Sequence, residues 1–523
     1  MKKAILAVVL CALAAACTVP GATPFGSPEA SIGSPANTQA TRQYYASLIA
    51  GPTPNLSALT LLMTMMPKGG DLHHHYSGAI YAETFLDWIK QNALCVYRAD
   101  NAQLKIRKFQ VPEQTRAELP EAQRALCLDA DQVRLSANNA FYRELLSRWS
   151  DKDFYNHSHE QVAPDQHFFD TFAYFGNVAN KNYNLGLRHL KARAIAENVQ
   201  YIETMLTSPW PPKAVSLPKA VDGLRADADD AQVNAALASL NDLLAANKIM
   251  DGGIEKYVNT MKSAAAGIDD DCFKVRFQTY VSRNSTPVEV FASLYMAFAA
   301  AGQGGHVVGV NIVGPENRVV AMRDYSLHMR MFAFLKQKYP AVRLSLHAGE
   351  LTLGMVPPEG LQSHIREAVE VAGAERIGHG VDIVYEYKAI DLLRTMRERR
   401  VAVEINLSSN AFILGVKDEA HPVLTYRHAG VPFVIATDDA GVFRSNLSGE
   451  YVLYASRYKP SYDELKETVF NSIRYSFLTD AEKAVELRGL AQRFAEFEGR
   501  VQELAKGVST GAATNKSGSC ARL

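Results

Sequence analysis

The chain has 523 residues, of which 47% are hydrophobic and 21% charged, the composition of a globular protein that can bury a large core. Lys and Arg together number 55, as do Asp and Glu, so net charge provides no attraction to nucleic acid or an anionic membrane surface. This balance favours a neutral small molecule as the ligand or substrate.

The N-terminus has the layout of an export signal. Two lysines precede an apolar stretch from Ala4 to Ala16, which is too short to cross a bilayer comfortably. We therefore predict a cleaved signal over residues 1–17. The sequence Ala-Ala-Ala-Cys also resembles the lipobox of bacterial lipoproteins, which predicts a lipid anchor on Cys17. A periplasmic or membrane-anchored lipoprotein is one expectation, and plain secretion is the other.

Two segments without apolar periodicity flank one predicted domain. Residues 18–40 are rich in Pro, Gly, Ser and Ala, so we predict a tether and N-terminal extension over residues 18–55. The last residues, 506–523, are similarly unpatterned and predict a frayed tail. The domain would then occupy residues 56–505.

The cysteines beyond Cys17 do not form a CxxC pair, which argues against a cysteine zinc site. Export would permit a disulfide, and Cys95 and Cys127 are the nearest pair in sequence. Isolated thiols fit these residues equally well.

Short apolar segments alternate with longer amphipathic ones along the predicted domain. Eight of the short segments are strand candidates: GGDLHHH (69–75), NVQYIETML (198–206), VRFQTYVS (275–282), HVVGVNIVG (306–314), VRLSLHAGE (342–350), ERIGHG (375–380), AVEINLSSN (402–410) and PFVIATDD (432–439). Strands that alternate with helices form parallel sheets, and eight is the number that closes a TIM barrel. An open doubly wound sheet usually has a Gly-rich phosphate turn after its first strand, which this sequence lacks. We therefore predict an α/β fold, a (β/α)8 barrel, with mainly helical insertions after the first two strands at about 85–165 and 208–270.

Polar residues recur where these strands end, which in such a barrel is the catalytic rim. His73 and His75 end the first strand, and because side chains alternate along a strand they share one face while His74 points away. An HxH pair alone is a weak metal signal. Its weight rises with the polar residues at the ends of the fifth, sixth and eighth strands: His347, Glu350, His379, Asp438 and Asp439.

These stretches resemble the adenosine deaminase family of metal-dependent amidohydrolase barrels. The matching motifs are MPKGGDLHHHYSGA, NIVGPE, LHAGE, RIGHG, LSSN and ATDDAGVF, in the family's order over about residues 56–500. The export signal and insertions look most like the secreted, growth-factor-like branch of this family. The resemblance implies hydrolytic deamination of adenosine and 2′-deoxyadenosine at C6 of the purine, with release of ammonia.

The resemblance also implies a role for each rim residue. One Zn²⁺ per chain would be bound by His73, His75, His347 and Asp438, and these donor types suit that ion. Glu350, kept protonated by burial, would donate a proton to ring N1. His379 would take the proton of the attacking water or orient that water, with Asp438 assisting.

Four further residues are implied to bind the substrate. Asp439 would contact N7, and the backbone N–H of Gly314 would reach N3. Ser77 and Gly78 would lie near the ribose 5′ end, where the family usually has aspartate in place of Ser77, so recognition there is neutral. In the seventh-strand motif, Ser409 and Asn410 are retained and could support the site.

Other functions remain open at this point. Adenine, AMP or a modified purine nucleoside could be the substrate, although no Lys/Arg cluster suited to a phosphate stands near the motifs. A noncatalytic secreted binding protein on the same fold is the alternative from another class. The small-molecule ligand would be a purine nucleoside, with no nucleic acid partner and no membrane contact apart from an anchor on Cys17; the sequence leaves the oligomeric state open.

Overall fold

The computed structural model describes residues 33–98, 109–156, 162–224 and 227–506. Within these ranges, no helix is both long and apolar enough to pass through a bilayer. The predicted export signal at 1–17 and all but the first residue of the predicted tail at 506–523 lie outside the described residues.

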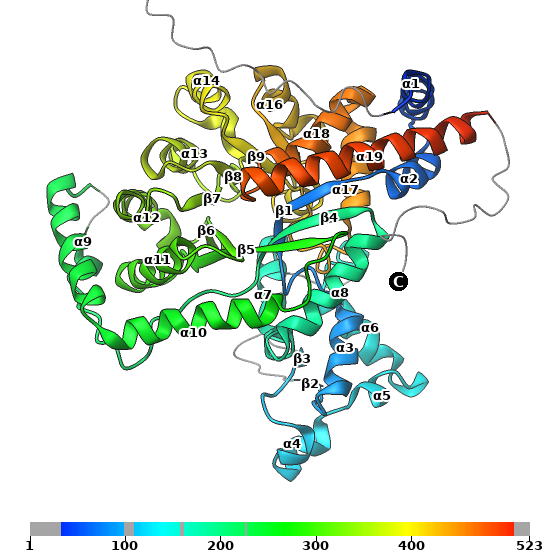
Figure 1. Cartoon of the computed structure of the whole chain (residues 1–523). Coiled ribbons are helices and arrows are strands. Elements are labelled where there is room, and N and C mark those ends of the chain that lie inside the picture. The colour runs from blue at the N-terminus through cyan, green and yellow to red at the C-terminus, as the bar shows by residue number, and fades with distance from the viewer. Residues whose placement is uncertain (1–32, 99–108, 157–161, 225–226, 507–523) are drawn as a thin grey trace, which may run out of the picture.

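Eight parallel strands form the centre of the molecule and follow one another in chain order around it (Figure 1). Main-chain hydrogen bonds then link the first strand to the segment after the last. The N–H of His75 donates to the carbonyl of Asp438 at 3.1 Å, and the N–H of Asp438 donates to the carbonyl of His73 at 2.8 Å. The predicted (β/α)8 barrel is confirmed. The strands are β1 (Gly69–His75), β4 (Val199–Met205), β5 (Lys274–Ser282), β6 (Val307–Val313), β7 (Arg343–Ala348), β8 (Arg376–His379), β9 (Ala402–Ile405) and β10 (Phe433–Ile435).

Helices surround the barrel, and their apolar faces cover strands that are buried along almost their whole length. Local signals fix several starts, such as the capping box of Thr286 and Glu289 with Pro287 in the first turn of α11. The helices between and after the later strands are α11 (Pro287–Gly302), α12 (Val319–Lys338), α13 (His364–Glu367), α14 (Ala389–Arg399), α15 (Leu407–Ile413), α16 (Val423–Ala429), α17 (Leu447–Tyr458), α18 (Tyr462–Arg474) and α19 (Asp480–Ala505).

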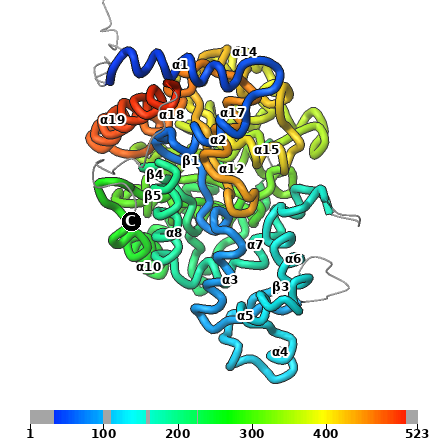
Figure 2. The backbone as a smooth tube through the Cα atoms, turned by 90° about the vertical axis from the view of Figure 1, so that its right-hand side faces the viewer, coloured from blue at the N-terminus to red at the C-terminus, as the bar shows by residue number. Residues whose placement is uncertain are grey.

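Both predicted insertions are present. The first extends from one end of the barrel (Figure 2) and contains a two-stranded antiparallel ribbon, and a disulfide joins Cys95 to Cys127 within it. Its elements are α3 (Ala82–Gln91), β2 (Tyr97–Arg98), β3 (Phe109–Gln110), α4 (Glu121–Leu126), α5 (Ala130–Val133) and α6 (Asn139–Arg148). Helices α7 (Pro164–Ala179) and α8 (Tyr183–Ala196) lead back to β4, and the second insertion supplies α9 (Asp230–Ala245) and α10 (Lys248–Ala265).

Two stretches differ from the sequence-based expectation. Residues 35–40, predicted as tether, belong to α1 (Pro35–Ile49), which packs against α19 and buries Tyr45; a second helix, α2 (Leu56–Met65), follows. This contact is made by residues distant in sequence, so local composition could not show it. The predicted strand 402–410 ends at Ile405, because the carbonyl of Asn406 accepts the N–H of Asn410 at 2.9 Å and starts α15.

Candidate metal centre

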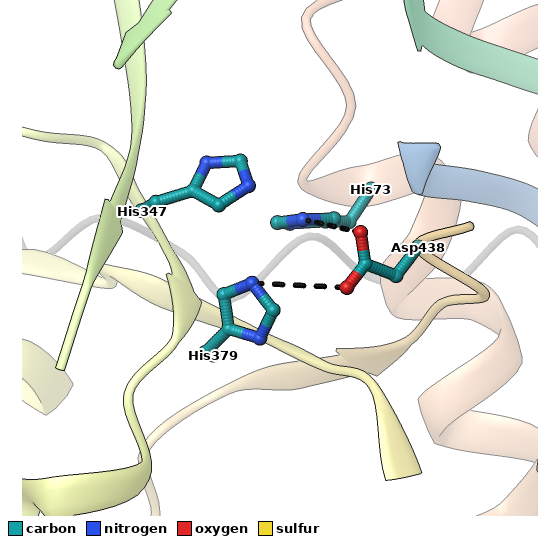
Figure 3. A group of neighbouring side chains, drawn as sticks. All are labelled: His73, His347, His379 and Asp438. Atoms are coloured by element: carbon teal, nitrogen blue, oxygen red, sulfur yellow. Dashed lines mark ion pairs between the residues drawn. The ribbon is translucent and has the colours of Figure 1, made fainter. Parts of the chain in front are cut away.

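Four buried side chains from distant parts of the chain converge at the carboxyl ends of the strands (Figure 3). They are His73 of β1, His347 of β7, His379 of β8 and Asp438, which follows β10. Each offers one ligand atom, and the four atoms lie within 4.8 Å of one another. This spacing allows several of them to bind one ion.

His75 lies beside this group although it is half-buried. Its Nε2 is 3.3 Å from Nε2 of His347 and 3.2 Å from Oδ1 of Asp438. His75, Asp438 and Asp439 form a second cluster that shares Asp438 with the first. The structure thus brings together all four predicted ligands, with His379 adjacent.

Hydrogen bonds orient two of the imidazoles so that Nε2 of each ring faces the centre. Nδ1 of His73 donates to Oε2 of Glu404 at 2.7 Å, and Nδ1 of His347 donates to Oδ1 of Asn311 at 2.9 Å. Asn311 must present its oxygen there, because its Nδ2 donates to Gln278 at 2.8 Å. Nδ1 of each ring therefore carries a proton, and Nε2 is the atom that faces the centre. Burial lowers the pKa of His347, which keeps that ring neutral. Burial also opposes the charged form of His73, but Asp438 and Glu404 raise the pKa of His73 to about 10, so a metal ion would displace a proton from its Nε2.

The carboxylate behind His73 is ionised. Burial alone would raise the pKa of Glu404, but Arg376 and His73 lower it to about 2. Nε of Arg376 donates to Oε1 of Glu404 at 2.6 Å, and the hydroxyl of Ser345 donates to the same oxygen at 2.7 Å. A carboxylate that accepts from an imidazole is the usual support for a metal-binding histidine.

The residues fit a divalent cation. Nε2 of His73 is buried and makes no hydrogen bond within the described part of the chain, although Oδ1 of Asp438 lies 3.5 Å away. A buried nitrogen without a partner is costly unless something binds it. Imidazoles with one carboxylate are a donor set suited to zinc.

Glu350 stands next to this centre, with Oε1 3.7 Å from Nε2 of His379. Burial, followed by the charge of Asp438, raises the pKa of Glu350 well above its usual value, which favours the neutral carboxyl. Its backbone is fixed by Glu316, whose carboxylate accepts the N–H groups of Gly349 and Glu350, each at 3.0 Å. The site therefore presents a proton donor in a fixed position.

Asp439 is a second buried carboxyl whose surroundings favour the protonated form. Burial, and then the neighbouring Asp438, raises the pKa of Asp439 well above its usual value. Gly78 lies directly against it: a Cβ at this glycine would sit 1.5 Å from Oδ1 of Asp439. Only glycine leaves room for this contact.

The backbone at two site residues is in the left-handed region, which side chains other than glycine seldom adopt. The φ angle is +68° at His379 and +59° at Asp438. Such conformations cluster at functional sites, where the surrounding structure enforces them. Gly314 directly follows β6 with φ +100°, and half-buried Ser77 lies in the turn after β1, so both predicted substrate contacts are on the same rim.

No role was assigned from the sequence to the residues that support the centre. Asn311 and Glu316 stand inside the quoted motif NIVGPE and Arg376 opens RIGHG, so their places there were usable signals. Glu404 stands in an ordinary strand pattern, which gave no signal.

Part of the chain is similar to known proteins. Residues 235–492 match the family model described as "Adenosine deaminase". The adenosine deaminase of Clostridium kluyveri is 27% identical over 175 residues, which cover 33% of this chain and 45% of that protein. The adenosine deaminase of Vibrio parahaemolyticus is 30% identical over 187 residues, covering 36% and 51% respectively. The chain thus spans about half the length of these relatives.

Among solved structures, an adenine deaminase from Arthrobacter aurescens superposes with a TM-score of 0.50 at 19% identity. The match covers 81% of this chain and 98% of the other. At this identity the likeness concerns the fold alone.

Proposed function

Because this chain belongs to the adenosine deaminase family, we propose that it catalyses zinc-dependent hydrolytic deamination of adenosine and 2′-deoxyadenosine. The products would be inosine or 2′-deoxyinosine and ammonia. The observation that carries this proposal is a set of three imidazoles and one carboxylate that converge beside a buried glutamic acid whose pKa is raised.

The ligands would be His73, His75, His347 and Asp438, holding one Zn²⁺. A bound Zn²⁺ lowers the pKa of water from 15.7 to about 7, which supplies a nucleophile at neutral pH. The Nε2 atoms of His73 and His347, which face the centre because Nδ1 of each ring donates to a protein oxygen, support this assignment.

The remaining steps belong to the protein's own side chains. Glu350 donates its proton to N1 of the purine, which makes C6 electrophilic while water adds there. Asp439, also protonated, donates a hydrogen bond to N7, and the backbone N–H of Gly314 donates to N3. Ser77 gives the sugar end a neutral hydrogen-bonding group. Asp438 would take the proton that the attacking water loses and pass it to the amino group at C6, where the C–N bond breaks and ammonia leaves. The proton of the new C6 hydroxyl would return to Glu350 as the carbonyl forms.

Substrate choice is tested with adenosine, 2′-deoxyadenosine, AMP, adenine and N6-methyladenosine, each incubated with the purified metal-loaded protein while ammonia is measured. We expect both unmodified nucleosides to be turned over at least about 10-fold faster than the others, a difference of about 1.4 kcal/mol in transition-state binding. Preference for AMP or adenine would replace the proposed substrate. No ammonia from any compound, with zinc bound, would favour a noncatalytic binding protein.

The contact between Gly78 and Asp439 provides a second test. In Gly78→Ala the added methyl must push Asp439 away from its position, and a displacement of about 1 Å in a site can cost about 100-fold in kcat/KM. Gly176→Ala in α7 is the matched control, since a Cβ there meets no atom within 4 Å. Ammonia release and thermal unfolding are measured for both. Equal rates in the two variants would contradict the proposed role of Asp439.

A further inference from the structure

We propose that Asn410 and His421 are positioning residues that fix the proton of the His379 imidazole on Nε2. His379 then meets the attacking water as a hydrogen-bond donor. This inference rests on the proposed function, but its first test below needs no substrate.

His421 is buried two residues before the start of α16. The backbone N–H of Val423 donates to its Nδ1 at 3.2 Å, so that nitrogen carries no proton. Burial lowers the pKa of His421 to about 3, and the ring is therefore neutral with its single proton on Nε2. A peptide N–H cannot reverse its role, which makes it a fixed starting point.

The orientation of the Asn410 side chain in α15 follows from the proton of His421. Nε2 of His421 lies 3.0 Å from Oδ1 of Asn410, and it must donate there because it holds the only proton of the ring. The oxygen of the Asn410 amide is thereby turned toward His421. Its Nδ2 consequently faces the barrel.

The tautomer of His379 follows from the groups that face its Nδ1. Nδ2 of Asn410 lies 3.0 Å from Nδ1 of His379, and Nδ2 of Asn406 lies 3.4 Å from the same atom. Both groups are donors, so Nδ1 of His379 is an acceptor and its proton sits on Nε2. Protonation at Nδ1 would set an N–H against two others in a buried site.

The Nε2 side of His379 faces two carboxyl groups without contacting either directly. Its Nε2–H lies 3.9 Å from Oδ2 of Asp438 and 3.7 Å from Oε1 of Glu350. Both separations exceed a direct hydrogen bond, so this N–H remains available to a water oxygen. A ring protonated there has no lone pair to take that water's proton, nor one to bind a metal. His379 therefore orients the water, which separates it from His73, His75 and His347.

The first test reads the tautomer directly. Protein labelled with ¹⁵N-histidine is isolated with its metal, and long-range ¹H–¹⁵N spectra are recorded; the His379 signals are those lost in His379→Gln. We expect Nδ1 of His379 to be unprotonated and Nε2 protonated. In Asn410→Asp, a carboxylate of the same shape accepts from both rings, so the proton should move to Nδ1. A wild-type ring protonated on Nδ1, or an unchanged tautomer in Asn410→Asp, would overturn the proposal.

The second test measures kinetics. In another enzyme class a wrong histidine tautomer costs about 10⁴-fold in kcat, so we expect Asn410→Asp to lose at least about 100-fold in kcat, with KM within about twofold. His421→Leu removes the donor and should lose about 10-fold, whereas His421→Gln keeps an N–H donor and should recover most of this. The matched control is His428→Leu, an exposed histidine of α16, which should leave kcat unchanged.

Metal content and thermal midpoint separate positioning from a merely structural role. A fall of kcat in step with lost metal or lost stability in all three variants would overturn the proposal. If the wild type releases no ammonia from any purine, the proposed function fails, while the tautomer measurement still decides whether Asn410 and His421 control His379.

Discussion

Replacing Glu350 by glutamine is expected to lower kcat/KM by about 10³-fold or more, within the range that general acid–base catalysis supplies. The glutamine side chain has nearly the same shape and keeps the backbone contacts with Glu316, but it cannot transfer a proton to N1. Because burial already favours the neutral form of Glu350, the change removes no buried charge, and the thermal midpoint should stay close to that of the wild type.

The measurements are ammonia release, zinc content and thermal unfolding of the same preparation. Glu359→Gln is the matched control, because Glu359 is exposed and follows the same strand. Zinc loss from Glu350→Gln in proportion to lost activity would identify Glu350 as a ligand, not an acid.

Replacing His75 by alanine is expected to release the metal and abolish activity. The sequence motifs include His75 among the ligands, whereas the group of four buried side chains contains His379 in its place. The two assignments predict opposite results. If His379 presents an N–H, His75→Ala should lose metal affinity by more than about 100-fold, beyond the loss typical of outer-shell partners, while His379→Gln keeps the metal.

Metal per chain is measured after dialysis against a chelator and after zinc is restored, with His428→Ala as the control for general loss of histidine. Free metal at about 100 times its dissociation constant stabilises a fold by about 2.7 kcal/mol. Restored zinc should therefore raise the thermal midpoint of the wild type, the control and His379→Gln, but not that of His75→Ala. A His379 variant that loses the metal while His75→Ala retains it would reverse our ligand assignment.

The barrel was predictable from sequence because its signals are local. In β1 the predicted segment and the observed strand coincide at residues 69–75, and Gly-rich or polar stretches bound most other strands. The exception was the segment after Ile405, where an apolar strand runs into Leu407 without a break. Hydrophobic pattern cannot separate a strand from a following short helix when the intervening residue is a single asparagine.

The positions of the candidate ligands were also predictable, since strand ends of a parallel barrel share one rim. The residues that hydrogen-bond to these ligands could not be predicted in the same way. Glu404 and Asn311 occupy strand positions where alternation shows only that a side chain points inward, and His421 is in a loop. Which partner each finds depends on register and loop path, and neither is a local property of the chain. Export, lipidation of Cys17 and membership of the growth-factor-like branch stay predictions.

The main-chain hydrogen bonds between β1 and Asp438 have a consequence for the order in which the barrel is completed. His73 and His75 leave the ribosome early, but Asp438 is added only after all eight strands have been made, and main-chain bonds from that aspartate to both histidines close the ring. Long-range pairings of this kind form late in folding. A truncated polypeptide without Asp438 would lack both these bonds and one of the proposed ligands, so we expect it to bind zinc more weakly than the full chain.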